Sequence, residues 1–364
     1  MRSGVIAVLL GVAAWPCQAA AAENDYLGLL RARDLTTFGF LRLDMRPAHA
    51  IHAPKGTWAI ETELAQQNTW ALSSGARDYL ESLPGRRPLG PEEVDAILAL
   101  PGENYVFDME LDELDVTLHY KFADRWGGYL VLSGVHYGGG FLDGAIESFH
   151  DTFGLDDNAR PAVRRDDVNL VADLKSATMA FTSAPTSGGM LDPTIGIRYS
   201  SDRQVKGWSY VLEAAAKLAW RGQKDFISTG KTDYGIQATL QRFGDQHAWY
   251  VSGSAVYYDG TTSATPTPAQ VVPTLVVGYE RKLNAQTHLI LQGYASSSVY
   301  SHAETDINSL LDPKYQLSIG VYRRMGRGVV SFALTENLQN FNNTPDVAFQ
   351  LGWAYSPALA TGKN

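Results

Sequence analysis

The sequence predicts an all-β chain, an antiparallel transmembrane β-barrel of about 12 strands, with a long loop excursion that contains a short amphipathic helix. Three observations predict this fold. Segments of about ten residues alternate apolar and polar side chains, as a strand does when one face meets lipid. Only 19% of the 364 residues are charged, whereas 11% are aromatic. Beyond the first twenty or so residues, no apolar run approaches the roughly 18–20 that a spanning helix needs.

The first residues predict export from the cytoplasm. Residues 1–22 combine Arg2, an apolar run and an alanine-rich exit, which is the organisation of a secretory signal peptide. We expect cleavage after Ala19 or Ala22. The single cysteine, Cys17, lies in this segment, so the mature chain has no thiol for a disulfide or a metal. Residues 23–56 are expected to form a periplasmic segment ahead of the barrel.

Long strands with aromatic ends distinguish a membrane barrel from a secreted β-sandwich. From Leu114 to Phe122, every second residue is apolar and the residues between them are polar. Another stripe begins at Trp208 and ends at Trp220, as in the aromatic girdles of membrane barrels. A soluble sandwich alternates too, but its strands average about 5–6 residues. The barrel is therefore favoured.

The order of short and long connections predicts the number of strands. Short turns alternate with long loops if twelve segments span the membrane, with both termini on the periplasmic side. Residues 168–172 and 178–181 also resemble strands; we place them as a small hairpin in the excursion, since one more spanning strand would reverse the alternation. The barrel covers 57–356 and a tail follows at 357–364. The expected strands are 57–69, 104–122, 126–137, 191–200, 207–220, 231–243, 247–258, 270–283, 286–300, 313–324, 327–338 and 346–356.

The long excursion covers residues 138–190 and begins with three glycines, which permit tight backbone geometry. Residues 141–153 then place Leu142, Ile146, Phe149 and Phe153 on one stripe. This spacing predicts an amphipathic helix, which Gly154 ends. The helix must bury its stripe, and we expect the excursion to plug the barrel.

The same stretch carries a family resemblance. Gly139-Gly140-Phe141-Leu142-Asp143, running into Phe149-His150-Asp151-Thr152-Phe153-Gly154-Leu155, resembles the signature segment of the bacterial domain-of-unknown-function 3187 family of outer-membrane proteins. The likeness extends loosely from Trp58 to Tyr355. It implies an outer-membrane β-barrel of unassigned activity, and it assigns no catalytic residue.

One face of the expected helix is a candidate metal site. Asp143, Glu147 and His150 follow one another at i, i+4 and i+7. Two carboxylates and an imidazole at this spacing could ligate one divalent cation. The alternative, which we favour, is a polar face in solvent. No other cofactor is expected.

Catalysis is the competing interpretation, in the form of a lipid- or lipopolysaccharide-modifying hydrolase with a Ser–His pair. His119 falls on the lumen face, where it would not meet a membrane lipid. His136 shares a strand with Ser133 but faces the other way. We therefore name no catalytic residue and favour a protein that is not an enzyme.

Charges of both signs occupy the inward positions. Cross-barrel ion pairs would close the lumen, whereas segregated walls would produce a transverse field in a water-filled pore. We expect a narrow or plugged pore for small solutes, or a structural envelope protein. Its partners are outer-membrane lipid, lipopolysaccharide and the barrel assembly machinery, and the net charge of −9 argues against nucleic acid. The inward polar residues are Glu61, Glu63, Glu113, Asp115, His119, Arg198, Glu213 and Lys217, with Lys314 and Arg324 on later strands.

Overall fold

The structure is a computed structural model that describes most of the chain. The expected signal peptide at 1–22 and the expected tail at 357–364 lie outside the described residues. Those that the structure describes are 26–31, 33, 36, 39–48, 54–154, 156–201, 206–224, 226–260, 269–339 and 343–356.

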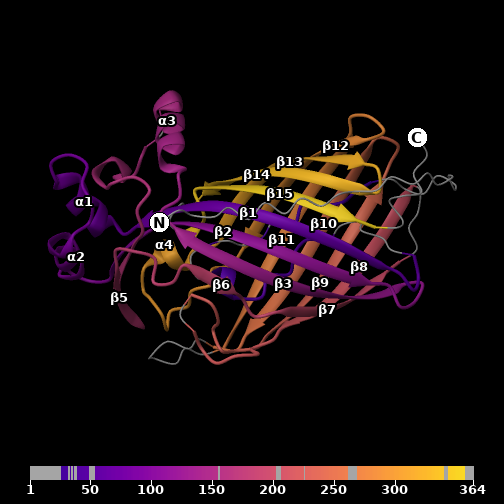
Figure 1. The fold of residues 1–364 in the computed structure, drawn as a ribbon, viewed down its shortest axis with the longest axis horizontal. Helices are drawn as coiled ribbons and strands as arrows, with labels where there is room; N and C mark the ends of the chain where they lie inside the picture. Colours follow the sequence, from indigo (N-terminus) through magenta and orange to yellow (C-terminus); the bar gives the residue numbers. More distant parts are fainter. Residues whose placement is uncertain are drawn as a thin grey trace, which may run out of the picture.

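Twelve antiparallel strands form a closed barrel, as the sequence predicts (Figure 1). Each strand pairs with its neighbour in the chain, and the first closes on the last, with Ile60 opposite Tyr355. The observed bounds agree with the expected ones to within a few residues. The barrel strands are β1 (Trp58–Leu72), β2 (Asn104–Tyr120), β3 (Trp126–Gly138), β7 (Thr194–Ser200), β8 (Gly207–Lys217), β9 (Asp233–Phe243), β10 (His247–Tyr258), β11 (Gln270–Lys282), β12 (Thr287–Ser296), β13 (Lys314–Met325), β14 (Gly328–Gln339) and β15 (Val347–Tyr355).

The outer surface of the barrel is apolar because the strands alternate strictly. Along β9 every second side chain is exposed, including Ile236 and Leu240. Aromatic pairs lie where the strands meet the short turns, such as Trp58 with Tyr120, whose ring centroids are 4.7 Å apart. This surface fits a lipid bilayer with an aromatic belt at its edge. None of the described helices is long and apolar enough to cross a membrane.

Beyond the long-loop end of the barrel, shown at the left in Figure 1, the loops form a separate layer. The predicted small hairpin is present there, because β4 extends the edge of β2 and β5 pairs with β4. Helices from the first long loop pack on this extension around Leu80, Ile97 and Val171. The elements of this layer and of the lumen are β4 (Asn169–Leu174), β5 (Ala177–Phe181), β6 (Gly188–Met190), α1 (Ser74–Ser82), α2 (Pro91–Leu98), α3 (Asp143–Phe153), α4 (Asn308–Leu311), η1 (Gly39–Leu41) and η2 (Arg160–Ala162).

Helix α3 is the amphipathic helix expected at 141–153. It ends at Gly154, whose φ of 67° is left-handed. Only half of its apolar stripe is buried: Leu142 and Ile146 are covered, whereas Phe149 is 49% and Phe153 66% exposed. The helix projects away from the barrel (Figure 1), so only its first turns reach a packing partner.

The lumen is filled by the N-terminal segment, not by the excursion. We call the described residues from 26 to 48 the lumen hairpin. Tyr26 donates to the carbonyl of Gly244 at a short turn, 3.0 Å away, and Arg42 reaches the carbonyl of Gly260 at a long loop. The chain is back at the short-turn end where the Gly56 amide donates to Lys121, at 2.7 Å.

This course differs from the expectation that residues 23–56 are periplasmic and that 138–190 supplies the plug. The excursion packs instead on the helices of the first long loop, and Leu170 of β4 also joins the buried cluster around Phe40 of the hairpin. Leucines and arginines of the hairpin contact the barrel wall. Their spacing in the sequence has no periodicity that would predict these contacts.

Candidate functional site

Apolar side chains seat the hairpin against the inner wall. Leu29 and Leu30 are buried, and burying one such side chain contributes roughly 1.5–3 kcal/mol. The wall has room for Leu29 because Gly278 faces inward: a Cβ at that position would overlap the Leu29 side chain. Met45 packs in the same way against Gly235. The inner surface of the barrel is therefore shaped to this segment.

A buried carboxylate holds the start of the hairpin at the short-turn end. Glu280 on β11 is fully buried, and its two oxygens accept the backbone N–H groups of Leu27, at 2.9 Å, and Gly28, at 2.8 Å. The Tyr250 hydroxyl donates to it at 2.6 Å, and Nδ1 of His288 contacts it at 2.5 Å. We call this arrangement the Glu280 latch. Charged acceptors make the stronger kind of hydrogen bond, so the latch fixes one end of the hairpin.

Four carboxylates on β1 and β2 form what we call the acidic wall: Glu61, Glu63, Glu113 and Asp115, all buried. Glu63 and Asp115 are directly opposite each other in the strand register, where two like charges destabilise a sheet. The charge that balances them comes from the hairpin.

Three arginines of the hairpin lie along the acidic wall. Arg31 is 3.5 Å from Glu61, Arg46 is 2.6 Å from Asp115, and Arg33 pairs with Glu113. Arg31 also donates to the Pro47 carbonyl at 2.8 Å, which ties the outgoing arm of the hairpin to the returning arm. The ion pairs therefore cross the lumen between plug and wall.

Elsewhere the lumen charges pair between neighbouring strands. Arg198 and Glu213 are 2.8 Å apart, and Lys217 and Asp233 are 3.3 Å apart. His119 contacts Glu61 at 3.4 Å. All eight inward polar residues named from the sequence thus lie inside the barrel; Lys314 does too and contacts Thr36 of the hairpin at 3.3 Å, while Arg324 is half-buried near the short-turn end.

Sequence reasoning missed Asp233, Glu280 and the hairpin arginines. Asp233 begins the inward stripe of β9, and Glu280 lies on that of β11. The same alternation that found Glu213 would have found both. No periodic pattern marks the arginines.

Two small cavities lie among the described residues of the lumen. A cavity of about 30 Å³ lies between the hairpin and the wall, next to Arg42, Glu213 and Lys217. It holds a water molecule or two, not a solute. A second cavity of about 50 Å³ lies at the short-turn edge beside His119 and Arg198. The described residues of the hairpin therefore occupy the lumen and leave room at these two places for water alone.

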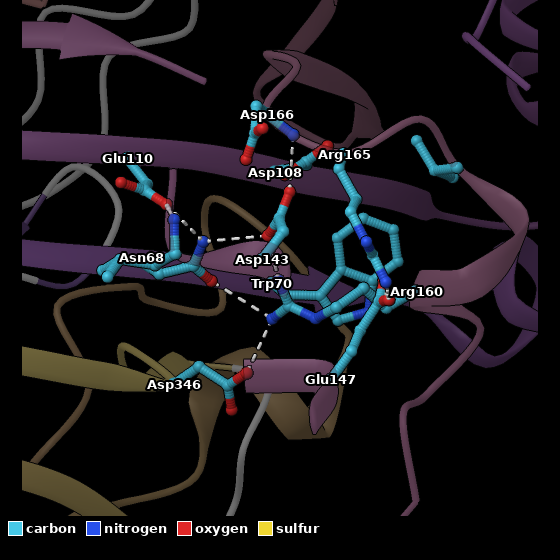
Figure 2. A network of polar contacts seen from close by, with 12 residues as sticks. Asn68, Trp70, Asp108, Glu110, Asp143, Glu147, Arg160, Arg165, Asp166 and Asp346 are labelled. Carbon is cyan, nitrogen blue, oxygen red and sulfur yellow. Dashed lines mark hydrogen bonds and ion pairs between the residues drawn. The ribbon is translucent and has the colours of Figure 1, made fainter. Parts of the chain in front are cut away.

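Outside the barrel, Arg160 joins the excursion to the wall (Figure 2). Its guanidinium is buried and donates to Asp143 of α3, to Asn68 of β1 at 3.1 Å and to Asp346 of the β14–β15 loop at 2.6 Å. The ring of Trp70 lies 5.2 Å from it. One cation thus connects three segments that are far apart in the sequence.

The structure does not bring the candidate metal ligands together. Asp143 pairs with Arg160, whereas Glu147 is bound by Arg86, at 2.8 Å, and by Arg165. His150 contacts Asp157 at 3.0 Å instead. Within the described residues, no group of three or more potential ligands is placed to hold a metal ion. Helical spacing places these three side chains near one another. Each of them, however, pairs with its own partner: an arginine for each carboxylate, and Asp157 for His150.

The candidate Ser–His pair is also separated. Ser133 is buried inside the barrel and donates to Asp115. His136 is on the outside and contacts Asp112 at 3.4 Å. Ser133 and His136 therefore face opposite sides of the strand, as the alternation predicts.

Comparisons with known proteins agree with this architecture. A family model described as a protein of unknown function (DUF3187) matches residues 96–356. No curated protein matches the chain. The COG4313 outer membrane channel from Pseudomonas putida F1 is similar with a TM-score of 0.51 and 10% identity, over 86% of this chain and 99% of that one. The P. putida toluene transporter TodX has a TM-score of 0.37 and 9% identity, over 84% and 91%. The chain has the fold of outer-membrane β-barrels.

Proposed function

We propose that this chain, which belongs to the family described as a protein of unknown function (DUF3187), is an outer-membrane channel for small polar solutes, closed by its own N-terminal hairpin. The observation that carries the proposal is the polar inner wall. Gln237, Thr239, Ser252, Gln292 and Ser318 face inward together with the charged residues. A surface of this kind is suited to water and polar solutes once the hairpin moves.

The hairpin is a removable part rather than a part of the wall. All twelve barrel strands pair with one another around the full circle, so the sheet closes without it. Among the described residues, the hairpin continues into the barrel only at its returning arm, ahead of β1. It can therefore leave the lumen without breaking a strand ladder. One of the similar solved structures is an outer membrane channel, which supports the same function here.

The setting of the channel is part of the proposal. We infer that residues 1–22 direct export and are cleaved, that the barrel assembly machinery inserts the strands, and that lipopolysaccharide surrounds the long-loop end. The apolar outer surface and the short turns opposite the long loops support this orientation.

A single substitution tests the gate in the full-length chain. Gly278→Leu would occupy the space that Leu29 takes, so we expect it to displace the hairpin and produce conductance in planar bilayers. Gly253→Leu is the matched control, since Gly253 lies on the exposed face of β10 with no atom within 4 Å of an added Cβ. Heat-modifiable migration on a gel verifies that both barrels are folded. A folded Gly278→Leu barrel that conducts no more than the control would contradict the channel.

A further inference from the structure

The acidic wall is the part of the lumen that the barrel strands themselves do not neutralise. Elsewhere in the lumen, a strand residue pairs with each carboxylate: Arg198 with Glu213, and Lys217 with Asp233, which also takes Arg42 of the hairpin. Among the described strand residues within salt-bridge distance of the acidic wall, the one basic side chain is His119, next to Glu61. The remaining balance comes from Arg31, Arg33 and Arg46 of the hairpin.

Two carboxylate oxygens of the acidic wall could each accept a further hydrogen bond. Oε1 of Glu63 and Oε2 of Glu113 are buried and accept no hydrogen bond in the described structure. Glu63 is 6% exposed and points into the same space as its three neighbours on the acidic wall. Buried carboxylate oxygens without donors are costly. The wall therefore offers a cation more acceptors than the hairpin arginines use.

We infer that the acidic wall binds cationic solutes, namely small organic cations that carry an ammonium or guanidinium group. In the closed channel, the hairpin arginines occupy the positions that these solutes would take. The inference rests on the proposed function and names its substrate class. Removing the hairpin alone would strand four carboxylates, and breaking buried pairs is strongly unfavourable. A cation that enters as the arginines leave keeps the wall neutral.

Ion selectivity tests the inference in the full-length Gly278→Leu channel. Once the hairpin arginines leave, the acidic wall is a surface of one charge sign, and such a surface raises the counter-ion concentration by about tenfold or more. K⁺ should therefore exceed Cl⁻ in permeability by at least about that factor. Adding Glu63→Gln and Asp115→Asn should bring the ratio close to one. Asp245→Asn, at an exposed short turn, should leave it unchanged. Preference for Cl⁻, or a ratio indifferent to the two neutralising substitutions, would overturn the inference.

A second measurement needs no conductance. In the full-length Arg33→Ala/Arg46→Ala variant, methylguanidinium at millimolar concentration should raise the midpoint of thermal unfolding, and methylurea, its neutral analogue, should not. Adding Glu63→Gln and Asp115→Asn should abolish the shift. No shift, or an equal shift with methylurea, would refute cation binding. A silent Gly278→Leu channel would then count against the proposed function alone, because the thermal shift still decides the inference.

Discussion

Replacing Arg160 by alanine should release the excursion from the barrel. The Arg160 side chain is 2% exposed and serves two carboxylates and one amide from three segments. Alanine would leave Asp143 buried without its cation, since that carboxylate is covered by the surrounding loops. The barrel ladder does not include this residue, so the effect should be confined to the long-loop end.

The size of the effect follows from the burial of the partners. Removing one member of a buried ion pair costs about 3–5 kcal/mol. Asp346 is 16% exposed and can regain water, which places the expected cost at the lower end, about 3 kcal/mol. Because about 1.4 kcal/mol corresponds to a factor of ten, local opening should become roughly a hundredfold more frequent.

Hydrogen exchange of the amides in α3 and β4 measures this opening. Arg160→Lys should give an intermediate loss of protection, because an ammonium cannot reproduce the guanidinium fork. Arg164→Ala is the matched control: Arg164 is 59% exposed and pairs with Asp167 at the surface, so protection should not change. Equal protection in the Arg160→Ala and Arg164→Ala variants would refute the assignment of Arg160 as the connection.

Three further changes have defined outcomes. Gly139→Ala would place a Cβ on the backbone carbonyl of Asp166, so limited proteolysis should cut the excursion faster, whereas Gly144→Ala has space and should not alter the rate. Glu280→Gln keeps the shape of the latch but removes its charge, and mass spectrometry should detect faster tryptic cleavage in the hairpin. Burial raises the pKa of Glu147, but the guanidinium partners outweigh it and leave this pKa below its ordinary value. Its stabilising effect is therefore present at neutral pH and lost as the pH falls through the lowered pKa; pepsin should cleave α3 increasingly toward acid pH, and Glu147→Gln should remove that ionisation-linked increase.

The barrel was predictable because its information is local. In β9, the run from Asp233 to Phe243 states by alternation which side chains face lipid, and the same signal placed Glu213 and Lys217 in the lumen. The small hairpin of β4 and β5 followed from counting turns. Each of these inferences needs only a few consecutive residues.

The hairpin was not predictable because its information is distant. Leu27 donates to a carboxylate 253 positions away, and Tyr26 to a carbonyl 218 positions away. No pattern of residue spacing in the sequence predicts either contact. The metal hypothesis failed for a related reason: the spacing of Asp143 and Glu147 describes one helix face, but Arg160 and Arg165 come from later in the chain.

The sequence distance between the hairpin and its partners on the wall has a consequence for the order of folding. Glu280 lies 253 positions beyond Leu27, which it binds, and Tyr322 lies 293 positions beyond Leu29. Contacts of such sequence separation form late. The hairpin therefore takes its place only after the sheet has closed around the space that it fills, so its seating marks the completion of the fold.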